Sequence, residues 1–229
     1  MNRDLHIVQA SILRELLFHN GTSFSSLNKT GLTNDHFTFH IKHLIEEGIV
    51  EKKEKFYYLT QKGKQYASKL DIYGLKMEMF GTPSVAITAK KIINGKVHYL
   101  IQQRLKEPLY GYYGFINGKI KFGEFAKDTA RRELFEETGL TGEPEIITIQ
   151  HRLRGPNRKE IKLDHYFFIY IIRSPKGKLK NTKEGKNFWK TEEEIKKLNT
   201  FPGFEHSLSV AIAGKVASYQ EMFVKVDNI

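Results

Sequence analysis

The chain has 229 residues, of which 40% are hydrophobic, so it can form one large domain or two small domains, each with its own core. It contains no cysteine, which excludes disulfides and thiolate metal sites and is typical of a reducing cytoplasm. The longest apolar run, residues 166–172, is far shorter than the roughly 20 residues of a membrane-spanning helix. We therefore expect a cytoplasmic protein with no membrane partner.

The net charge of +11 is unevenly distributed along the chain. Residues 1–75 hold 10 Lys or Arg against 8 Asp or Glu, a net charge of +2. Residues 152–190 hold 12 against 3, a net charge of +9. This basic segment can attract an anionic substrate or nucleic acid, although a solvated basic surface explains the individual lysines equally well.

Apolar residues at helical spacing predict three helices at the start of the chain, over residues 4–19, 24–29 and 34–47. Ser23 and Thr33 or Asn34 are suitable N-caps, and Gly48 ends the third helix. The short runs 49–52 and 56–59 flank a charged turn and predict a hairpin, after which Thr60 begins another helix.

Three helices followed by a hairpin resemble the winged helix-turn-helix domain of transcription regulators, over about residues 3–73. The stretch HIKHLIEEGIVEKKEKFYYLTQKGK is similar to that family's third helix, wing and following segment. The resemblance implies that the third helix enters the major groove of double-stranded DNA while the wing meets phosphates. The residues so implicated are Asn34, His36, Thr38, Lys42 and His43 on the helix, and Lys52, Lys53 and Lys55 on the wing. The alternative is a domain that only mediates homodimerisation.

Three histidines of the third helix, His36, His40 and His43, suggest a metal site at first. No cysteine or carboxylate partner accompanies them. We therefore interpret His40 as a histidine at the edge of the core.

Glycines at 74 and 81 bracket a short junction, so we predict a first domain over residues 1–73, a linker over 74–82 and a second domain over 83–229. In the second domain, Asn94-Gly95 predicts a hairpin turn between strands 85–88 and 97–104. Further strands are expected at 146–150 and 166–173, the latter central in a sheet because it is almost continuously apolar. Helical spacing over 204–224 predicts a closing helix.

Residues 118–140, GKIKFGEFAKDTARRELFEETGL, carry the most specific pattern of the chain. Good helix formers over 125–138 and a glycine at 139 predict a helix with a left-handed C-cap. Glu133, Glu136 and Glu137 then share one face, where their oxygens suit Mg²⁺ or Mn²⁺. A solvated acidic helix face is the alternative.

The spacing G-x5-E-x7-R-E-U-x-E-E-x-G-U, with U apolar, resembles the signature box of the Nudix hydrolases, and every fixed position is filled. The resemblance implies an α/β/α sandwich with a mixed sheet, preceded here by the small winged-helix (α+β) domain. It also implies that Glu136 and Glu137 are the main metal ligands, that Glu133 and the Gly118 carbonyl contribute, and that Glu124 binds a further metal or orients water. Arg132 is expected to hold one carboxylate in place. The general base is Glu133 or Glu184.

Nudix hydrolases cleave a nucleoside diphosphate linked to another moiety. Pro156, 16 residues after Leu140, resembles a proline of the ADP-ribose pyrophosphatase subfamily, whereas Gly155-Pro156-Asn157 also predicts an ordinary turn. Side chains that can stack on a base or contact phosphates are Tyr112, Tyr113, Phe115 and Trp189, and Arg104, Arg152, Arg154 and Arg158.

The sequence thus favours a Mg²⁺- or Mn²⁺-dependent pyrophosphohydrolase that acts on ADP-ribose or a nucleotide sugar. One alternative is a pyrophosphatase of oxidised or other nucleoside triphosphates. Another is a transcriptional regulator whose second domain senses a nucleotide, but the complete box favours retained catalysis.

Overall fold

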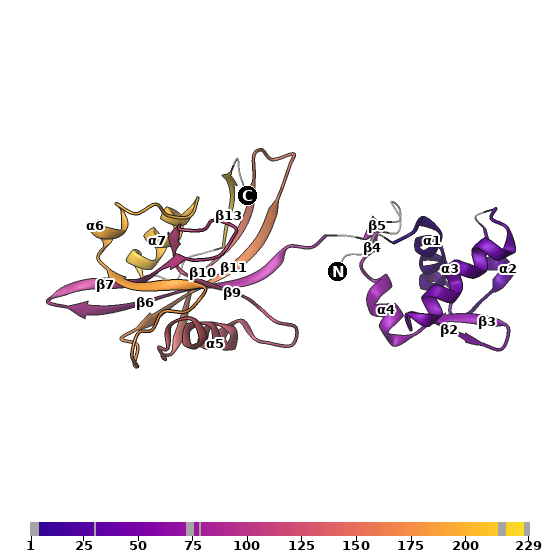
Figure 1. Ribbon diagram of the computed structural model, residues 1–229, viewed down its shortest axis with the longest axis horizontal. Helices are drawn as coiled ribbons and strands as arrows, with labels where there is room; N and C mark the ends of the chain where they lie inside the picture. The colour runs from indigo at the N-terminus through magenta and orange to yellow at the C-terminus, as the bar shows by residue number, and fades with distance from the viewer. Residues whose placement is uncertain (1–4, 30, 72–75, 78, 215–218, 227–229) are drawn as a thin grey trace. The chain divides into compact units, whose positions relative to one another are not determined.

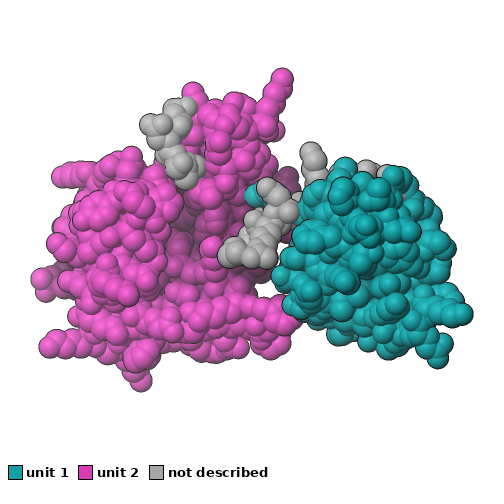
Figure 2. All heavy atoms as spheres, turned by 45° about the vertical axis from the view of Figure 1, so that its right-hand side comes forward, with its two compact units in different colours: residues 1–79 teal, residues 80–229 magenta. Residues whose placement is uncertain are grey.

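The computed structural model describes residues 5–29, 31–71, 76–77, 79–214 and 219–226. The chain divides into two compact units, residues 1–79 and 80–229 (Figure 2). Gly74, at the start of the predicted junction, lies outside the described residues.

The first unit has the predicted order of helices and hairpin (Figure 1). Its elements are α1 (Ile7–Phe18), β1 (Thr22–Ser23), α2 (Phe24–Leu27), α3 (Asn34–Glu46), β2 (Val50–Lys53), β3 (Phe56–Leu59), α4 (Gln61–Ala67), β4 (Leu70–Asp71) and β5 (Lys76–Met77). Two of the predicted caps form, since Ser23 accepts from the Ser26 amide and Thr60 from the Gly63 amide; Thr33 is the N-cap residue of α3 but makes no side-chain capping hydrogen bond. Strand β1 was not expected; it pairs with β3 and extends the hairpin to three strands.

The second unit is built on one mixed sheet in the order β12-β7-β6-β11-β10-β13, with β8 paired to β7 and β9 paired to β6. The strands are β6 (Thr82–Ile93), β7 (Lys96–Arg104), β8 (Tyr113–Gly114), β9 (Ile116–Lys119), β10 (Pro144–Gly155), β11 (Leu163–Arg173), β12 (Gly185–Lys190) and β13 (Gln220–Lys225). The helices are α5 (Ala126–Thr138), α6 (Glu192–Ile195) and α7 (Phe204–Ala213).

Helices cover both faces of this sheet, so the predicted α/β/α sandwich is confirmed. Figure 1 shows α5 on one face and α6 and α7 on the other. Because side chains alternate along each strand, the sheet contributes to two cores. Val85 and Ile87 pack with Leu134 on the α5 side, whereas Phe115 and Phe167 pack with the α7 side.

Two predictions about the strands are confirmed. Asn94 and Gly95 both have positive φ, 49° and 76°, as the two-residue hairpin turn between β6 and β7 requires. Strand β11 lies inside the sheet, parallel to β6 and antiparallel to β10.

The predicted helix over residues 204–224 is wrong beyond its first half. Helix α7 ends at Ala213 because Gly214 adopts the left-handed conformation, with φ 61°. Residues 220–225 instead form β13, which runs parallel to β10 at the edge of the sheet. Residues 215–218 lie outside the described part of the chain. Within that part, no helix is long and apolar enough to cross a membrane.

Candidate active site

Helix α5 carries the acidic residues of the box at the surface of the sheet. It ends as predicted: Gly139 has φ 71° and donates its amide to the Phe135 carbonyl at 2.9 Å. Ala130 and Leu134 are fully buried and fix the helix against the sheet. The packing therefore fixes which side of the helix carries the carboxylates.

The guanidinium group of Arg132 binds three carboxylates of the box. Its Nε and Nη2 donate to the two oxygens of Glu124 at 2.7 and 2.8 Å. Its Nη1 donates to Glu133 at 2.6 Å and to Glu136 at 3.2 Å. The sequence predicted a single carboxylate partner. The planar fork of arginine makes the larger set possible, since it places several donors in fixed directions.

These contacts shift the pKa values of the carboxyl groups in opposite directions. The hydrogen bonds from Arg132 lower the pKa of Glu124 to about 2. Burial raises the pKa of Glu133, although Arg132 opposes the shift. Glu124 is thus held firmly as an anion, and the Glu133 side chain, 14% exposed against 19% for Glu124, is the less solvated of the two.

Gly118 lies in β9, paired with Val85, and directly faces Glu133. A Cβ atom at this position would collide with the Glu133 side chain. The glycine is therefore required for the close approach of β9 to α5, which brings the two ends of the box together.

Glu137 is held by groups outside the box. Gln102 of β7 and Thr182 both donate to its Oε2 atom at 3.2 Å. Asn187 of β12, which is buried, donates to the Glu137 backbone carbonyl at 2.7 Å. The sequence analysis missed these three residues. Gln102 and Asn187 lie in strands that carry several other polar residues, and Thr182 lies in the loop before β12, so no pattern in the sequence distinguished them.

The model of the NUDIX domain family matches residues 82–208. The chain belongs to the Nudix family. The match covers more than half of the chain and contains the whole box, so the resemblance inferred from residues 118–140 is confirmed.

Solved structures with a similar fold are distant in sequence. The NUDIX domain of Shewanella oneidensis NrtR, solved in complex with ADP ribose, is 16% identical with a TM-score of 0.51, over 68% of this chain and 97% of that chain. A MutT protein from Bacillus halodurans is 21% identical with a TM-score of 0.50, over 62% and 89%. A NUDIX hydrolase from Nitrosomonas europaea is 18% identical with a TM-score of 0.50, over 60% and 92%. No curated protein matches the chain.

Nudix hydrolases generally use a divalent metal, and the donor set of this box fits one. Its carboxylate oxygens suit a hard ion that keeps part of its water shell. The Glu136 side chain is 54% exposed and can reach such an ion from α5. Among the described residues, however, no three acidic or histidine side chains are already arranged around a common metal position. Arg132 occupies the oxygens instead.

Two further predicted site residues lie on the loops beside the box. Glu184 forms an ion pair with Lys106, and its backbone carbonyl accepts from the Leu105 amide at 2.8 Å. The Arg104 guanidinium donates to the carbonyls of Lys106, Glu107 and Pro108 at 2.8 to 3.2 Å. Arg104 thereby shapes the 106–108 loop, and the charge of Glu137 in the box also acts on it.

The aromatic candidates separate into buried and accessible side chains. Phe115 is 3% exposed and packs edge-on against Phe204, so its predicted contact with a substrate base is corrected to a role in the core. Tyr112 is half-buried and stacks on Phe201 at 6.4 Å, and Tyr113, also half-buried, lies 6.2 Å from Phe188. Trp189, the fourth candidate, is also half-buried, and Lys91 lies over its ring at 4.3 Å from the centroid.

The remaining substrate candidates lie along β10. Arg152 and Arg154 are buried on the α7 side of the sheet, whereas Glu133 meets Gly118 on the α5 side. The structure therefore does not bring these arginines together with the carboxylates. Pro156 directly follows β10 in the connection to β11, as the turn interpretation predicted.

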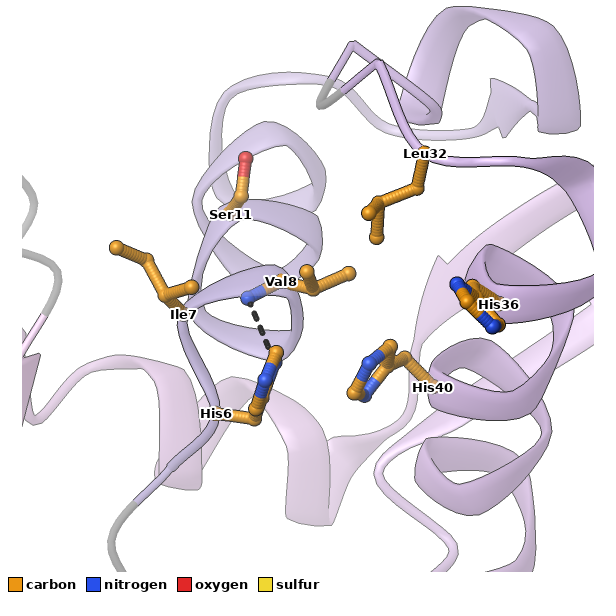
Figure 3. A pocket seen from close by; sticks show the side chains of 7 residues that line it. All are labelled: His6, Ile7, Val8, Ser11, Leu32, His36 and His40. Carbon is orange, nitrogen blue, oxygen red and sulfur yellow. Dashed lines mark hydrogen bonds between the residues drawn. The ribbon is translucent and has the colours of Figure 1, made fainter.

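In the first unit, the predicted DNA contacts lie at or near the surface. On α3, Asn34, His36 and Lys42 are exposed and Thr38 is half-buried; on the hairpin, Lys52, Lys53 and Lys55 are exposed. His36 and His40 also line a cavity of about 550 Å³ with His6 of the segment before α1 (Figure 3). His40 stacks on His6 with ring centroids 4.2 Å apart, and burial lowers its pKa.

Proposed function

We propose that residues 80–229 form a Mg²⁺- or Mn²⁺-dependent pyrophosphohydrolase that cleaves a nucleoside diphosphate linked to another moiety. The observation that carries this proposal is the clamp in which Arg132 holds Glu124, Glu133 and Glu136. A bound cation supplies neutralisation of the diphosphate oxygens and activation of the attacking water.

Each carboxylate receives a role from its surroundings. Glu136, which is exposed, and Glu137, held by Gln102 and Thr182, provide the main oxygen ligands. Glu124 anchors Arg132 and orients the rest of the set. Of the two candidate bases we favour Glu133, because it faces Gly118 inside the box, whereas Glu184 lies on a loop outside the box and pairs with Lys106.

For the substrate we favour ADP-ribose or a nucleotide sugar. The similarity in fold to a NUDIX domain solved with ADP ribose supports this choice, and the half-buried Tyr112 and Tyr113 offer ring surface for a base. The alternative, a nucleoside triphosphate pyrophosphatase, is supported by the similar fold of a MutT protein. Products distinguish the two, since ADP-ribose yields AMP and ribose 5-phosphate whereas a triphosphate yields pyrophosphate.

The proposal is tested by a Mg²⁺-dependent hydrolysis screen over nucleoside diphosphate derivatives and triphosphates, with the products identified. The double variant Glu136→Gln/Glu137→Gln should lose turnover while keeping its circular dichroism spectrum. Glu143→Gln is the matched control, because Glu143 is an exposed carboxylate bound by Lys127 and Arg131 outside the proposed site. Undiminished turnover in the double variant would overturn the assignment.

A second candidate function concerns the first unit, which we propose to be a winged helix that binds double-stranded DNA. Its support is the exposure of His36 and Lys42 on α3, followed by a hairpin with exposed Lys52, Lys53 and Lys55. In this case the nucleotide bound by the Nudix unit would act as an effector of a regulator. Homodimerisation of the enzyme through the same unit is the competing role.

A further inference from the structure

Two arginines are buried side by side on the α7 face of the Nudix sheet. Arg152 and Arg154 occupy alternate positions of β10 and are 6% and 9% exposed. Both guanidinium groups pack over the ring of Phe167, at 5.2 and 5.6 Å. Neither has a carboxylate within ion-pair distance among the described residues. Buried charges normally have such a partner, so the pair calls for an explanation.

The first arginine is anchored and the second is free. Arg152 donates through Nη2 to Gln150 of β10 and to Ser207 of α7. Within the described part of the chain, the Arg154 guanidinium makes no hydrogen bond. The Nε atoms of both arginines are buried without an acceptor. The two groups therefore offer several unused donors at one place.

The neighbouring strand adds a third unused nitrogen. His165 lies opposite Arg152 in the β10–β11 register and stacks on Phe167 at 5.3 Å, and its Nδ1 atom is buried without a partner. Glu205 acts on Arg152 only from a distance, since it is exposed on α7 and pairs with His206. The burial of these cations lowers the pKa of Arg152 to about 9. Within the described part of the chain, the cluster therefore has no carboxylate paired with it.

We propose that Arg152, Arg154 and His165 form an anion site that binds a phosphate group of the nucleotide substrate. Paired guanidinium groups suit phosphate because each presents parallel donors to two oxygens. Gln150 and Ser207 hold the Arg152 guanidinium group in place before a ligand binds, so less conformational entropy is lost on binding. The ring of Phe167 packs against the guanidinium groups of both arginines.

The β9 strand connects this site with the box. Gly118 faces Glu133 on the α5 side, so the next residue, Lys119, faces the α7 side. Lys119 pairs with Ser84, which lies beside Phe167 in the same row of the sheet, and its charge acts on His165. The two phosphates of a diphosphate share one bridging oxygen and cannot lie on opposite faces of β9, so the arginines would bind a phosphate of the substrate other than those of the cleaved diphosphate. This inference rests on the proposed function for its substrate class.

The test is direct binding of inorganic phosphate to the full chain after removal of metal with EDTA, measured by calorimetry. Arg154→Met should weaken phosphate binding by about tenfold or more, since a bidentate contact is lost. Lys162→Met is the matched control, because Lys162 lies just before β11 but is exposed and paired with Glu160. It should bind phosphate as the wild type does.

Thermal unfolding separates a ligand site from a structural arginine. In phosphate-free buffer Arg154→Met should raise the Tm, because it removes an uncompensated buried charge. Added phosphate should raise the Tm of the wild type and so reduce the Tm difference between the wild type and Arg154→Met. An arginine that only stabilises the fold would give a lower Tm on replacement, and this result, or unchanged phosphate binding, would overturn the proposal.

Kinetics then tie the site to the substrate. With the substrate identified by the hydrolysis screen, Arg154→Met should raise KM about tenfold and change kcat little, because the lost contact is one of binding. Unchanged KM would place the bound phosphate outside the substrate and contradict the proposal. Phosphate binding is measured without metal or turnover. If the unit proved not to hydrolyse nucleotides, the phosphate-binding result would therefore still stand, so failure of the proposed function can be distinguished from failure of the anion site.

Discussion

Arg132 and Glu124 form a two-bond ion pair that joins the helix of the Nudix box to the loop before it. The Nε–Oε1 and Nη2–Oε2 distances are 2.7 and 2.8 Å. The remaining Nη1 atom binds Glu133 and Glu136. One side chain thus sets the positions of three carboxylates, and its geometry decides whether the set is pre-organised for a metal.

We predict that Arg132→Lys lowers kcat on the order of tenfold to a hundredfold, because a single ammonium group cannot make the paired bonds and also reach Glu133. Steady-state hydrolysis under saturating Mg²⁺ measures the effect. The neighbouring Arg131→Lys is the control, since Arg131 is exposed and pairs with Asp128 and Glu143 at the surface. Equal activity of the two variants would contradict the clamp.

The same ion pair predicts a pH dependence of stability. The pKa of Glu124 falls from 4.5 to about 2 on folding, so its contribution is fully present above pH 4.5 and is lost as the pH falls towards 2. We expect Glu124→Gln to lower the free energy of unfolding by about 1–2 kcal/mol at pH 7 in metal-free buffer, and progressively less below pH 4.5.

Urea unfolding followed by tryptophan fluorescence measures this difference for the Nudix unit alone, because Trp189 is the single tryptophan of the chain. Glu145→Gln is the control, since Glu145 forms an exposed pair with Arg173. A difference between the wild type and Glu124→Gln that stays constant from pH 7 to pH 2.5 would argue against the shifted carboxyl group.

Gly118 and Glu133 predict a strong coupling between two substitutions. Gly118→Ala places a methyl group where the Glu133 side chain lies, so we expect it to lower kcat/KM about a hundredfold by displacing that carboxylate. In a Glu133→Ala background, Gly118→Ala should lower kcat/KM little further, because the side chain with which the new methyl group collides has been removed. Kinetics of the four proteins of this cycle provide the measurement. Fully additive losses would show that Gly118 acts through another group.

The parts of the site that the sequence predicts are those in which the pattern is local. Helical spacing and Gly139 define α5, and the carboxylates follow from it. Gln102, Thr182 and Asn187 could not be placed in this way. They reach Glu137 from 35, 45 and 50 residues away, through a strand register that the sequence alone does not specify.

Strand β13 is a second element whose formation depends on a distant partner in the chain. Met222, Phe223 and Val224 form a continuous apolar run without the alternation of a half-buried strand, so the helical spacing of α7 dominated the longer window. Parallel pairing with β10 decides the outcome, and that partner lies 70 residues earlier. The burial of Phe115, which lies between β8 and β9, likewise depends on a tertiary contact, its packing against Phe204 of α7.

The hairpin lysines of the first unit provide the last prediction. If Lys52, Lys53 and Lys55 contact phosphates, changing all three to Gln should weaken binding to double-stranded DNA and reduce the slope of log Kd against log salt by about 2–3. Fluorescence anisotropy over a salt series measures the slope. The matched control changes Lys176, Lys178 and Lys183 to Gln, which removes the same charge from exposed positions of the Nudix unit. An unchanged slope in the hairpin variant would remove the wing from the DNA interface, and the first unit would then be a dimerisation domain whose size and charge are explained without nucleic acid.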